Sequence, residues 1–215
     1  RLISRPTQGS FGIVDPWVVA PGDPERSILY YRMSKVGRGR MPHFGSRVID
    51  DQGLALLREW ITQLDDSTAG GVAEADRSII AAAKQLTATN RETLQTLSKE
   101  KDAASASAQT AIERLLSSTS GALLLAGSLR GNAGKLPADV RNAVIAEGTA
   151  RTDPLVRDLF EAFLPESART KTLGSTINGS DLLALDGNPG RGRKLYLTAE
   201  GMLCRSCHKV GDQGK

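Results

Sequence analysis

Both cysteines of this 215-residue chain, and one of its two histidines, lie within five residues near its end, Cys204-Arg205-Ser206-Cys207-His208. Residues three positions apart in a helical turn lie on the same face, so both thiols can reach one edge of a flat ligand. The histidine that follows then falls beneath that ligand. This spacing is typical of covalent c-type haem attachment, with His208 as the proximal ligand of the iron.

Three other roles for the two cysteines remain open but are weaker. A structural zinc site needs two further ligands, usually a second pair, and the chain has no other cysteine. A thioredoxin-type redox pair opens a helix after a strand, and no strand pattern precedes Cys204. A disulfide between the two thiols leaves His208 without a role. The sequence therefore predicts a covalent haem c held by Cys204, Cys207 and His208.

The composition favours a mainly helical protein, because 40% of the residues are hydrophobic but only 4% are aromatic. The net charge of +4 is weakly basic. Since the positive charges are not interleaved with aromatic residues, nucleic acid is not expected as a partner. Apolar runs such as residues 122–126 are far shorter than the roughly 18 residues of a membrane span, so no transmembrane segment is predicted.

The clearest predicted helix runs from Asp51 to Leu64, with Asp50 or Asp51 as its N-cap. Its apolar residues recur at three- and four-residue steps and predict one buried face, namely Leu54, Leu57, Trp60, Ile61 and Leu64. A short helical turn is expected over residues 27–33. Gly70-Gly71 is the strongest linker signal in the chain and predicts a domain boundary.

From residue 74 to residue 165 the pattern is helical throughout. Apolar clusters predict helices around 79–86, 94–97, 104–116, 123–129, 137–145 and 154–163. Pro137 and Pro154 suit the first turns of their helices. Short amphipathic helices joined by tight turns favour a stack of helical hairpins of the HEAT type. Residues 166–190 are expected to form a looser connection, followed by a helix over residues 191–198.

Residues 190–215 resemble the opening of a class I cytochrome c domain. Together with residues 153–161 and Leu173-Gly174, they resemble the haem-binding region of large planctomycete-type proteins, which often join dehydrogenase-like propellers, helical repeats and cytochrome c. Near the start of the chain, three segments are similar to the C-terminal half of such a domain, namely residues 20–29, Arg40-Met41-Pro42-His43 and the helix to Trp60-Ile61. The resemblance implies that Met41 is the distal iron ligand of a first haem module.

Residues near these motifs also have possible roles other than iron ligation. Met41 itself has the alternative of filling core space, as methionine usually does. His43 is a weaker candidate because Pro42 directs the two side chains differently, which favours a surface role. Met202 belongs to the proximal side of the second haem, where packing is the expected role.

The predicted fold class is mainly α, with two truncated cytochrome c-like modules flanking a helical spacer. The predicted domains are 1–69, the C-terminal half of one module; 72–173, the HEAT-like spacer; and 174–215, the start of a second module. Met41 has no attachment motif before it, and His208 has no methionine after it. We therefore expect a longer protein, with a Cys-x-x-Cys-His motif upstream of Arg1 and a ligand methionine downstream of Lys215.

The predicted function is electron transfer by haem c, in the periplasm or another extracytoplasmic compartment where such haems are attached. The expected partner is a redox protein or a fused dehydrogenase domain. Basic residues around the motif are suited to steering an acidic partner, although a solvated face is the simpler interpretation: Arg191, Arg193, Lys194, Arg205 and Lys209.

Two alternatives come from other classes of protein. One is a cytochrome-linked dehydrogenase or peroxidase-like enzyme whose catalytic domain lies outside this chain. No nucleophile–base pair stands out within the chain, so its status as an enzyme is left open. The other is a helical binding scaffold, which would need a long exposed apolar groove on residues 74–165.

Overall fold

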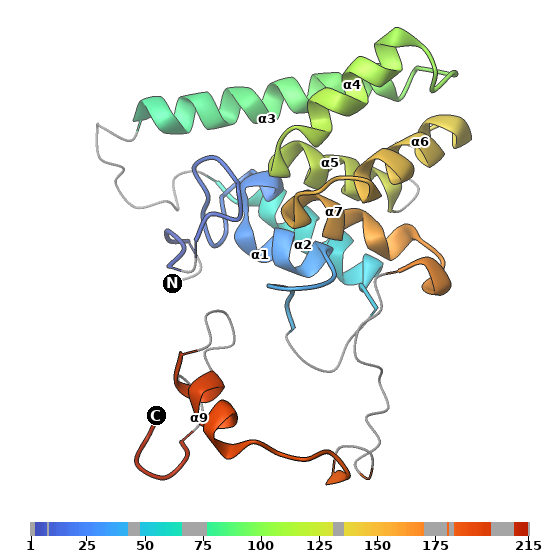
Figure 1. Cartoon of the computed structure of the whole chain (residues 1–215). Coiled ribbons are helices and arrows are strands. Elements are labelled where there is room, and N and C mark those ends of the chain that lie inside the picture. The colour runs from blue at the N-terminus through green and yellow to red at the C-terminus, as the bar shows by residue number, and fades with distance from the viewer. Residues whose placement is uncertain are drawn as a thin grey trace. The chain divides into compact units, whose positions relative to one another are not determined.

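A computed structural model of the chain describes residues 3–7, 9–42, 48–65, 77–130, 136–169, 180, 183–198 and 209–214 (Figure 1). The chain forms two compact units, residues 1–170 and residues 171–215, called here the first and second units. The described residues are mainly helical, as the sequence predicts, and pair as β-structure only in two isolated bridges.

The first unit holds seven of the described α-helices, which are α1 (Ile28–Ser34), α2 (Asp51–Gln63), α3 (Arg77–Leu97), α4 (Ala106–Leu116), α5 (Thr119–Leu129), α6 (Ala138–Thr149) and α7 (Pro154–Phe160). Three 3-10 turns accompany them, η1 (Pro24–Arg26), η4 (Glu161–Phe163) and η5 (Glu166–Ala168). The second unit holds α9 (Pro189–Thr198), close to the predicted helix over 191–198.

Helix α5 forms the centre of the first unit. Nine of its residues are buried, so it is enclosed on all sides rather than along one stripe. Figure 1 shows α3 and α4 on one side of α5, with α7 and α1 on the other, and α5 is in contact with each of them. The helices of residues 77–160 therefore pack around α5 together with the N-terminal segment.

Side-chain caps fix the starts of four helices. Asp50 accepts a hydrogen bond from Gly53 N at 2.9 Å, which confirms the predicted start of α2. Asp153 accepts one from Leu155 N at 2.9 Å, and Pro154 is the first residue of α7, as predicted. Ser105 and Ser118 cap α4 and α5 in the same way. Each cap satisfies one of the backbone donors that a helix start leaves unpaired.

Two details of the predicted helices are wrong. Residues 79–97 form one continuous helix, α3, where the sequence predicts two. The apolar pattern lapses there because Thr87 and Asn90 are buried polar residues. On α2, Leu54 and Ile61 are buried as predicted, but Trp60 is 41% exposed. Six residues after Leu54, its side chain lies about 120° around the helix and so falls at the edge of the buried face.

Residues 1–69 and 72–170, predicted to fall in separate domains, lie in one compact unit with a common core. Several hydrogen bonds join them; among these, Tyr31 Oη donates to Leu155 O at 2.9 Å, Ser120 Oγ to Glu25 O at 3.0 Å, and Val36 N to Asp158 O at 3.0 Å. The Gly70-Gly71 pair lies outside the described residues. The division between the two units falls at residues 170–171, near the predicted start of the last domain.

Candidate functional site

The predicted haem-attachment residues Cys204, Cys207 and His208 lie outside the described residues, as do His43 and Met202. The described residues on either side of the attachment motif are in contact with each other. Tyr196 Oη, on α9, donates a hydrogen bond to Gln213 O at 3.1 Å. Val210 and Gln213 are joined by two backbone hydrogen bonds of 2.9 and 3.1 Å, with Gly211 between them at φ +59°. The chain before the motif is therefore tied to the chain after it.

Helix α9 begins at an asparagine cap and carries a cluster of cations. Asn188 Oδ1 accepts a hydrogen bond from Arg191 N at 2.8 Å, and Gly192 N donates to Asn188 O at 2.9 Å. Arg191, Arg193 and Lys194 are all exposed. The helix contains no acidic residue, so its positive charge is not compensated along its own length.

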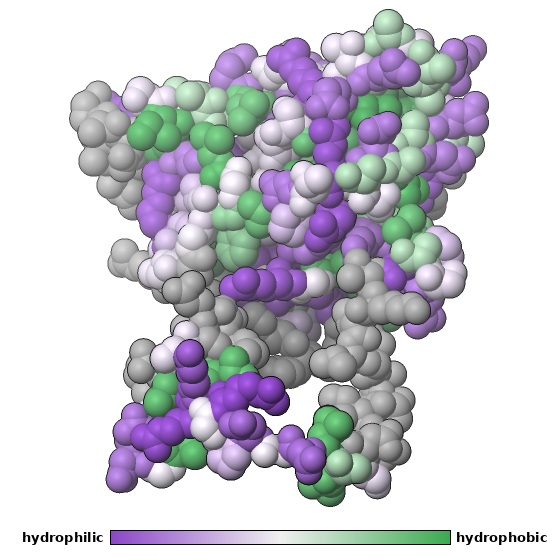
Figure 2. Space-filling model, in the orientation of Figure 1, coloured by the Kyte–Doolittle hydropathy of each residue, from purple (hydrophilic) through white to green (hydrophobic). Residues whose placement is uncertain are grey.

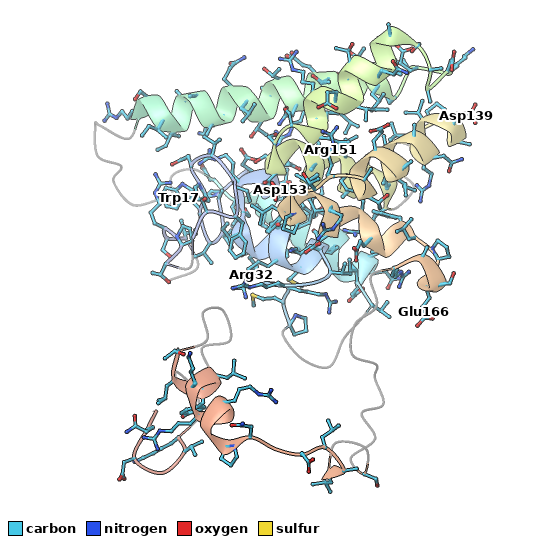
Figure 3. The ribbon with its side chains drawn as sticks, in the orientation of Figure 1. Trp17, Arg32, Asp139, Arg151, Asp153 and Glu166 are labelled. Carbon is cyan, nitrogen blue, oxygen red and sulfur yellow. The ribbon has the colours of Figure 1, made fainter. Side chains whose placement is uncertain are left out.

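Met41 lies at the end of a turn that is fixed to α1. Gly37 and Gly39 adopt φ +73° and +81°, a left-handed conformation that glycine adopts without strain. Arg32 (Figure 3) holds this turn from both directions, because its Nε donates to Gly39 O at 2.8 Å and its carbonyl accepts from Met41 N at 3.0 Å. Met41 is partly buried, so its backbone is anchored while its side chain retains some exposure.

The structure brings together a buried ionic cluster that the sequence pattern does not predict. Glu25 is 1% exposed, and its carboxylate contacts Arg58 on α2 and Arg91 on α3, the latter at 2.8 Å. Asp23 Oδ2 accepts a hydrogen bond from Thr87 Oγ1 at 3.1 Å, and Asp23 Oδ1 lies 3.8 Å from Arg91 Nη2. The cluster thus anchors α2 and α3 to η1.

The same cluster extends into the N-terminal loops. Arg26 Nη2 donates to Asp15 Oδ2 at 2.6 Å, and Asp15 also pairs with Arg5. The guanidinium of Arg5 lies 4.6 Å from the centre of the Trp17 ring (Figure 3), which is a cation–π distance. Three residues of the ionic cluster come from the run Asp23-Pro24-Glu25-Arg26, which was quoted above only for its resemblance to part of a cytochrome c domain.

Asp23 has the clearest electrostatic cost in this cluster. Burial raises the pKa of its carboxyl above the ordinary value of 3.8, and the neighbouring Glu25 charge raises it further. Arg26, Arg91 and the Thr87 hydroxyl act in the opposite direction but do not cancel these effects. The protonated form of Asp23 is therefore favoured more in the folded protein than in the unfolded chain.

A second buried ion pair joins the end of α1 to α7. Lys35 Nζ donates to Asp158 Oδ2 at 2.9 Å and to Arg38 O at 2.8 Å, and its side chain is 2% exposed. Burial, followed by the Asp158 and Asp153 charges, raises the pKa of the nearby Tyr31 hydroxyl. Tyr31 therefore stays neutral and serves as the hydrogen-bond donor to Leu155 O.

An open groove of about 560 Å³ runs between α3 and α4. Its lining residues are mostly hydroxylated or charged, namely Thr89, Glu92, Thr93, Thr96, Ala106, Ser107, Thr110, Ala111 and Arg114. Within the described part of residues 74–165, this groove does not supply the apolar surface that the scaffold alternative requires.

Neither a metal centre nor a membrane span is found in the part of the chain that the structure describes. Those residues contain no group of three His, Cys, Asp or Glu side chains placed to hold a metal ion. None of their helices combines the length and the apolar character needed to cross a bilayer. Compared with models of protein families, with curated proteins and with solved structures, the chain matches none.

Proposed function

We propose that this chain carries a covalently attached c-type haem and works in electron transfer. The observation that carries the proposal is the run Cys204-Arg205-Ser206-Cys207-His208. Each thiol can add across one haem vinyl group, sulfur bonding to carbon and the hydrogen going to the second carbon. The imidazole of His208 supplies the nitrogen ligand that iron requires. The donor set therefore suits haem, which when bound supplies an iron that gains and loses one electron.

Described residues of the second unit also support this proposal, in addition to the motif itself. The hydrogen bond from Tyr196 to Gln213 joins the chain on either side of residues 204–208. Joining the two sides reduces the conformational entropy that the intervening residues lose when their thiols and imidazole are fixed on one ligand. This bond between described residues on the two sides of residues 204–208 supports the proposal.

Met41 is proposed as the distal ligand of a first haem module, of which residues 1–69 form one half. The support is its setting, a turn anchored to α1 through Arg32 and followed by α2. A thioether at the sixth position raises the potential of a haem iron. On the same proposal, residues 72–173 are a HEAT-like spacer and residues 174–215 begin a second cytochrome c-like module.

The proposal also assigns a location and partners. Haem c is attached outside the cytoplasm, so the chain is expected in the periplasm or another extracytoplasmic compartment. The electron would come from, or pass to, a separate redox protein or a dehydrogenase domain fused to the same protein. The enzyme alternative keeps the same haem site but adds a catalytic domain that lies outside this chain.

The test is covalent haem on the full chain, exported in a bacterial host that attaches c-type haems. A denaturing gel stained for haem peroxidase activity should show a stained band, because thioether bonds survive denaturation. Cys204→Ala combined with Cys207→Ala should abolish the stain. Met202→Leu, which changes a neighbour that is neither thiol nor imidazole, is the matched control and should keep it. A band that is unstained in the parent chain, or equally stained in the double variant, would contradict the proposal.

A further inference from the structure

The positive charge of this protein is concentrated in the second unit. Residues 171–215 contain seven Lys or Arg against four Asp or Glu, a net charge of +3. Residues 1–170 contain 21 Lys or Arg against 20 Asp or Glu, a net charge of +1. About a fifth of the chain therefore carries three of the four net charges, and charge asymmetry of this kind points to an interaction.

Buried cations of the first unit such as Arg26 and Lys35 are paired with carboxylates, whereas α9 carries three exposed cations within four residues. In the first unit, Arg26, Lys35 and Arg91 face carboxylates at 2.6 to 2.9 Å. On α9, Arg191, Arg193 and Lys194 are exposed and make no ion pair with any described residue. In the view of Figure 2, hydrophilic residues cover much of α9. These three charges are therefore available to a partner.

Lys209 extends this cationic surface from the other side of the attachment motif. It is exposed and lies next to the Val210–Gln213 turn, which Tyr196 ties to α9 through its 3.1 Å hydrogen bond to Gln213 O. We define the α9 basic surface as Arg191, Arg193, Lys194 and Lys209. It is drawn from both described segments that flank the proposed haem site.

The features of this surface favour an acidic protein over a nucleic acid. A single-strand binding surface needs aromatic rings on which bases stack. Tyr196 is partly buried, and its hydroxyl is bonded to Gln213. A small group of exposed charges suits a weak, transient encounter, as redox complexes typically are.

We propose that the α9 basic surface steers an acidic electron-transfer protein to the second unit, an inference that rests on the proposed function. Opposite charges raise the rate of encounter before any close contact forms. The exposed carboxylates of the partner would face Arg191, Arg193, Lys194 and Lys209. One electron would then pass between the partner's redox centre and the haem, one centre being oxidised as the other is reduced.

The experiment measures electron transfer from a reduced, acidic plant-type ferredoxin to the ferric haem of the full chain by stopped-flow absorbance. The test variant combines Arg191→Gln, Arg193→Gln and Lys194→Gln. The matched control combines Lys99→Gln, Lys101→Gln and Arg114→Gln, which removes the same charge from exposed positions of the first unit. At low ionic strength the test variant should react about tenfold more slowly than the parent chain, and the control within about twofold.

Two further measurements complete the design. The rate with a neutral reductant, hydroquinone, should be the same in all three proteins, because no charge steers that encounter. Raising the ionic strength to 1 M should remove the difference between the parent chain and the test variant, because screening then acts over about 3 Å. Equal slowing of the test and control variants with ferredoxin would overturn the proposal, since only total charge would then matter.

Failure of the proposed function would be recognised separately, by a parent chain without covalent haem. Retention on immobilised ferredoxin, which needs no haem, then tests whether the α9 basic surface binds an acidic protein. Elution of the test variant at lower salt than the control supports the α9 basic surface, and elution of both at the same salt overturns it. Tighter binding of the parent chain to a single-stranded DNA oligonucleotide than to ferredoxin at equal salt would also overturn it.

Discussion

Single residues determine how the buried ionic cluster behaves. Glu25 contacts two guanidinium groups, whereas Asp23 shares Arg91 with it at the longer distance of 3.8 Å. Two carboxylates therefore compete for one cation in a buried place, and the less well-paired Asp23 bears the cost. Burial, and then the Glu25 charge, raise the pKa of Asp23, so pH acts on this residue of the cluster.

Asp23→Asn is expected to raise the free energy of unfolding at pH 7. The folded-state pKa of Asp23 lies above its unfolded value, so the stability gained from its proton is complete below about pH 3.8 and lost as pH rises through the folded pKa. Asparagine resembles the protonated form and keeps an acceptor for Thr87. Urea unfolding from pH 4 to pH 7 should show the advantage of the variant growing with pH. A variant that is less stable at pH 7 would mean that Arg26 and Arg91 outweigh burial.

The cluster shows why sequence alone falls short at the scale of residues. The run Asp23-Pro24-Glu25-Arg26 is visible as a charged turn, but its partners Arg58 and Arg91 follow 33 and 66 residues after Glu25. Charged residues are usually exposed, so nothing local marks these as buried. Only the packing of α2 and α3 against η1 reveals their pairing.

At the scale of elements, the contact between α6 and α7 depends on one glycine. A Cβ atom on Gly148 would lie 2.4 Å from Cγ of Phe160, a fully buried ring. The ring is held in the core and cannot move away freely. The absence of a side chain at residue 148 is therefore what lets the two helices approach so closely.

Gly148→Ala should destabilise the first unit by about 1–3 kcal/mol, the range for overpacking a core. Gly127→Ala in α5 is the control, because its Cβ would meet no atom closer than 3.4 Å, and alanine favours a helix by up to about 1 kcal/mol. Urea unfolding followed by circular dichroism gives both values. Equal stability of Gly148→Ala and the parent chain would show that α6 and α7 can separate at little cost.

Helix positions were predictable to the extent that local chemistry marks their ends. The caps at Asp50 and Asp153 gave the starts of α2 and α7, because a cap is formed within a few residues. The continuity of α3 was not predictable, since Thr87 and Asn90 interrupt its apolar pattern while facing the buried interior. The exposure of Trp60 depends on where the edge of the neighbouring core falls, which periodicity alone does not specify.

At the scale of the whole molecule, Lys35 and Asp158 connect parts of the first unit that are 123 residues apart. Both side chains are at most 9% exposed. The pair therefore links the N-terminal segment to α7 in the interior. The helices on the two sides of residues 70–71 should accordingly unfold together.

Lys35→Met should lower the free energy of unfolding by about 3 kcal/mol, the lower end for breaking a buried pair, because Arg157 still lies 3.4 Å from Asp158. Both tryptophans, Trp17 and Trp60, lie before residue 70, while circular dichroism reports all helices. Fluorescence and circular dichroism should therefore shift together in urea. A shift in fluorescence alone would indicate separate domains, and exposed Lys99→Met should shift neither.

The candidate site follows the same rule: its features that are close together in the sequence were predictable, and those that depend on distant residues were not. The five residues from Cys204 to His208 are adjacent in the chain, so the sequence alone is enough to propose haem attachment there. The hydrogen bond between Tyr196 and Gln213 spans 17 residues, and the turn that holds Met41 depends on Arg32 nine residues earlier, so neither was predicted. The unequal charge of the two units could have been counted in advance, but the boundary at residues 170–171 was needed to do so.

The enclosure of α5 sets the order in which the first unit opens. Nine of the 11 residues of α5 are buried, against four of the 21 residues of α3. Free energies of local opening follow the apolar contacts that opening breaks. Amide hydrogens of α3 are therefore expected to exchange with solvent through partial openings that leave the rest of the unit folded. Those of α5 are expected to exchange only when the whole unit unfolds, so the centre of the first unit should also be its last structure to be lost.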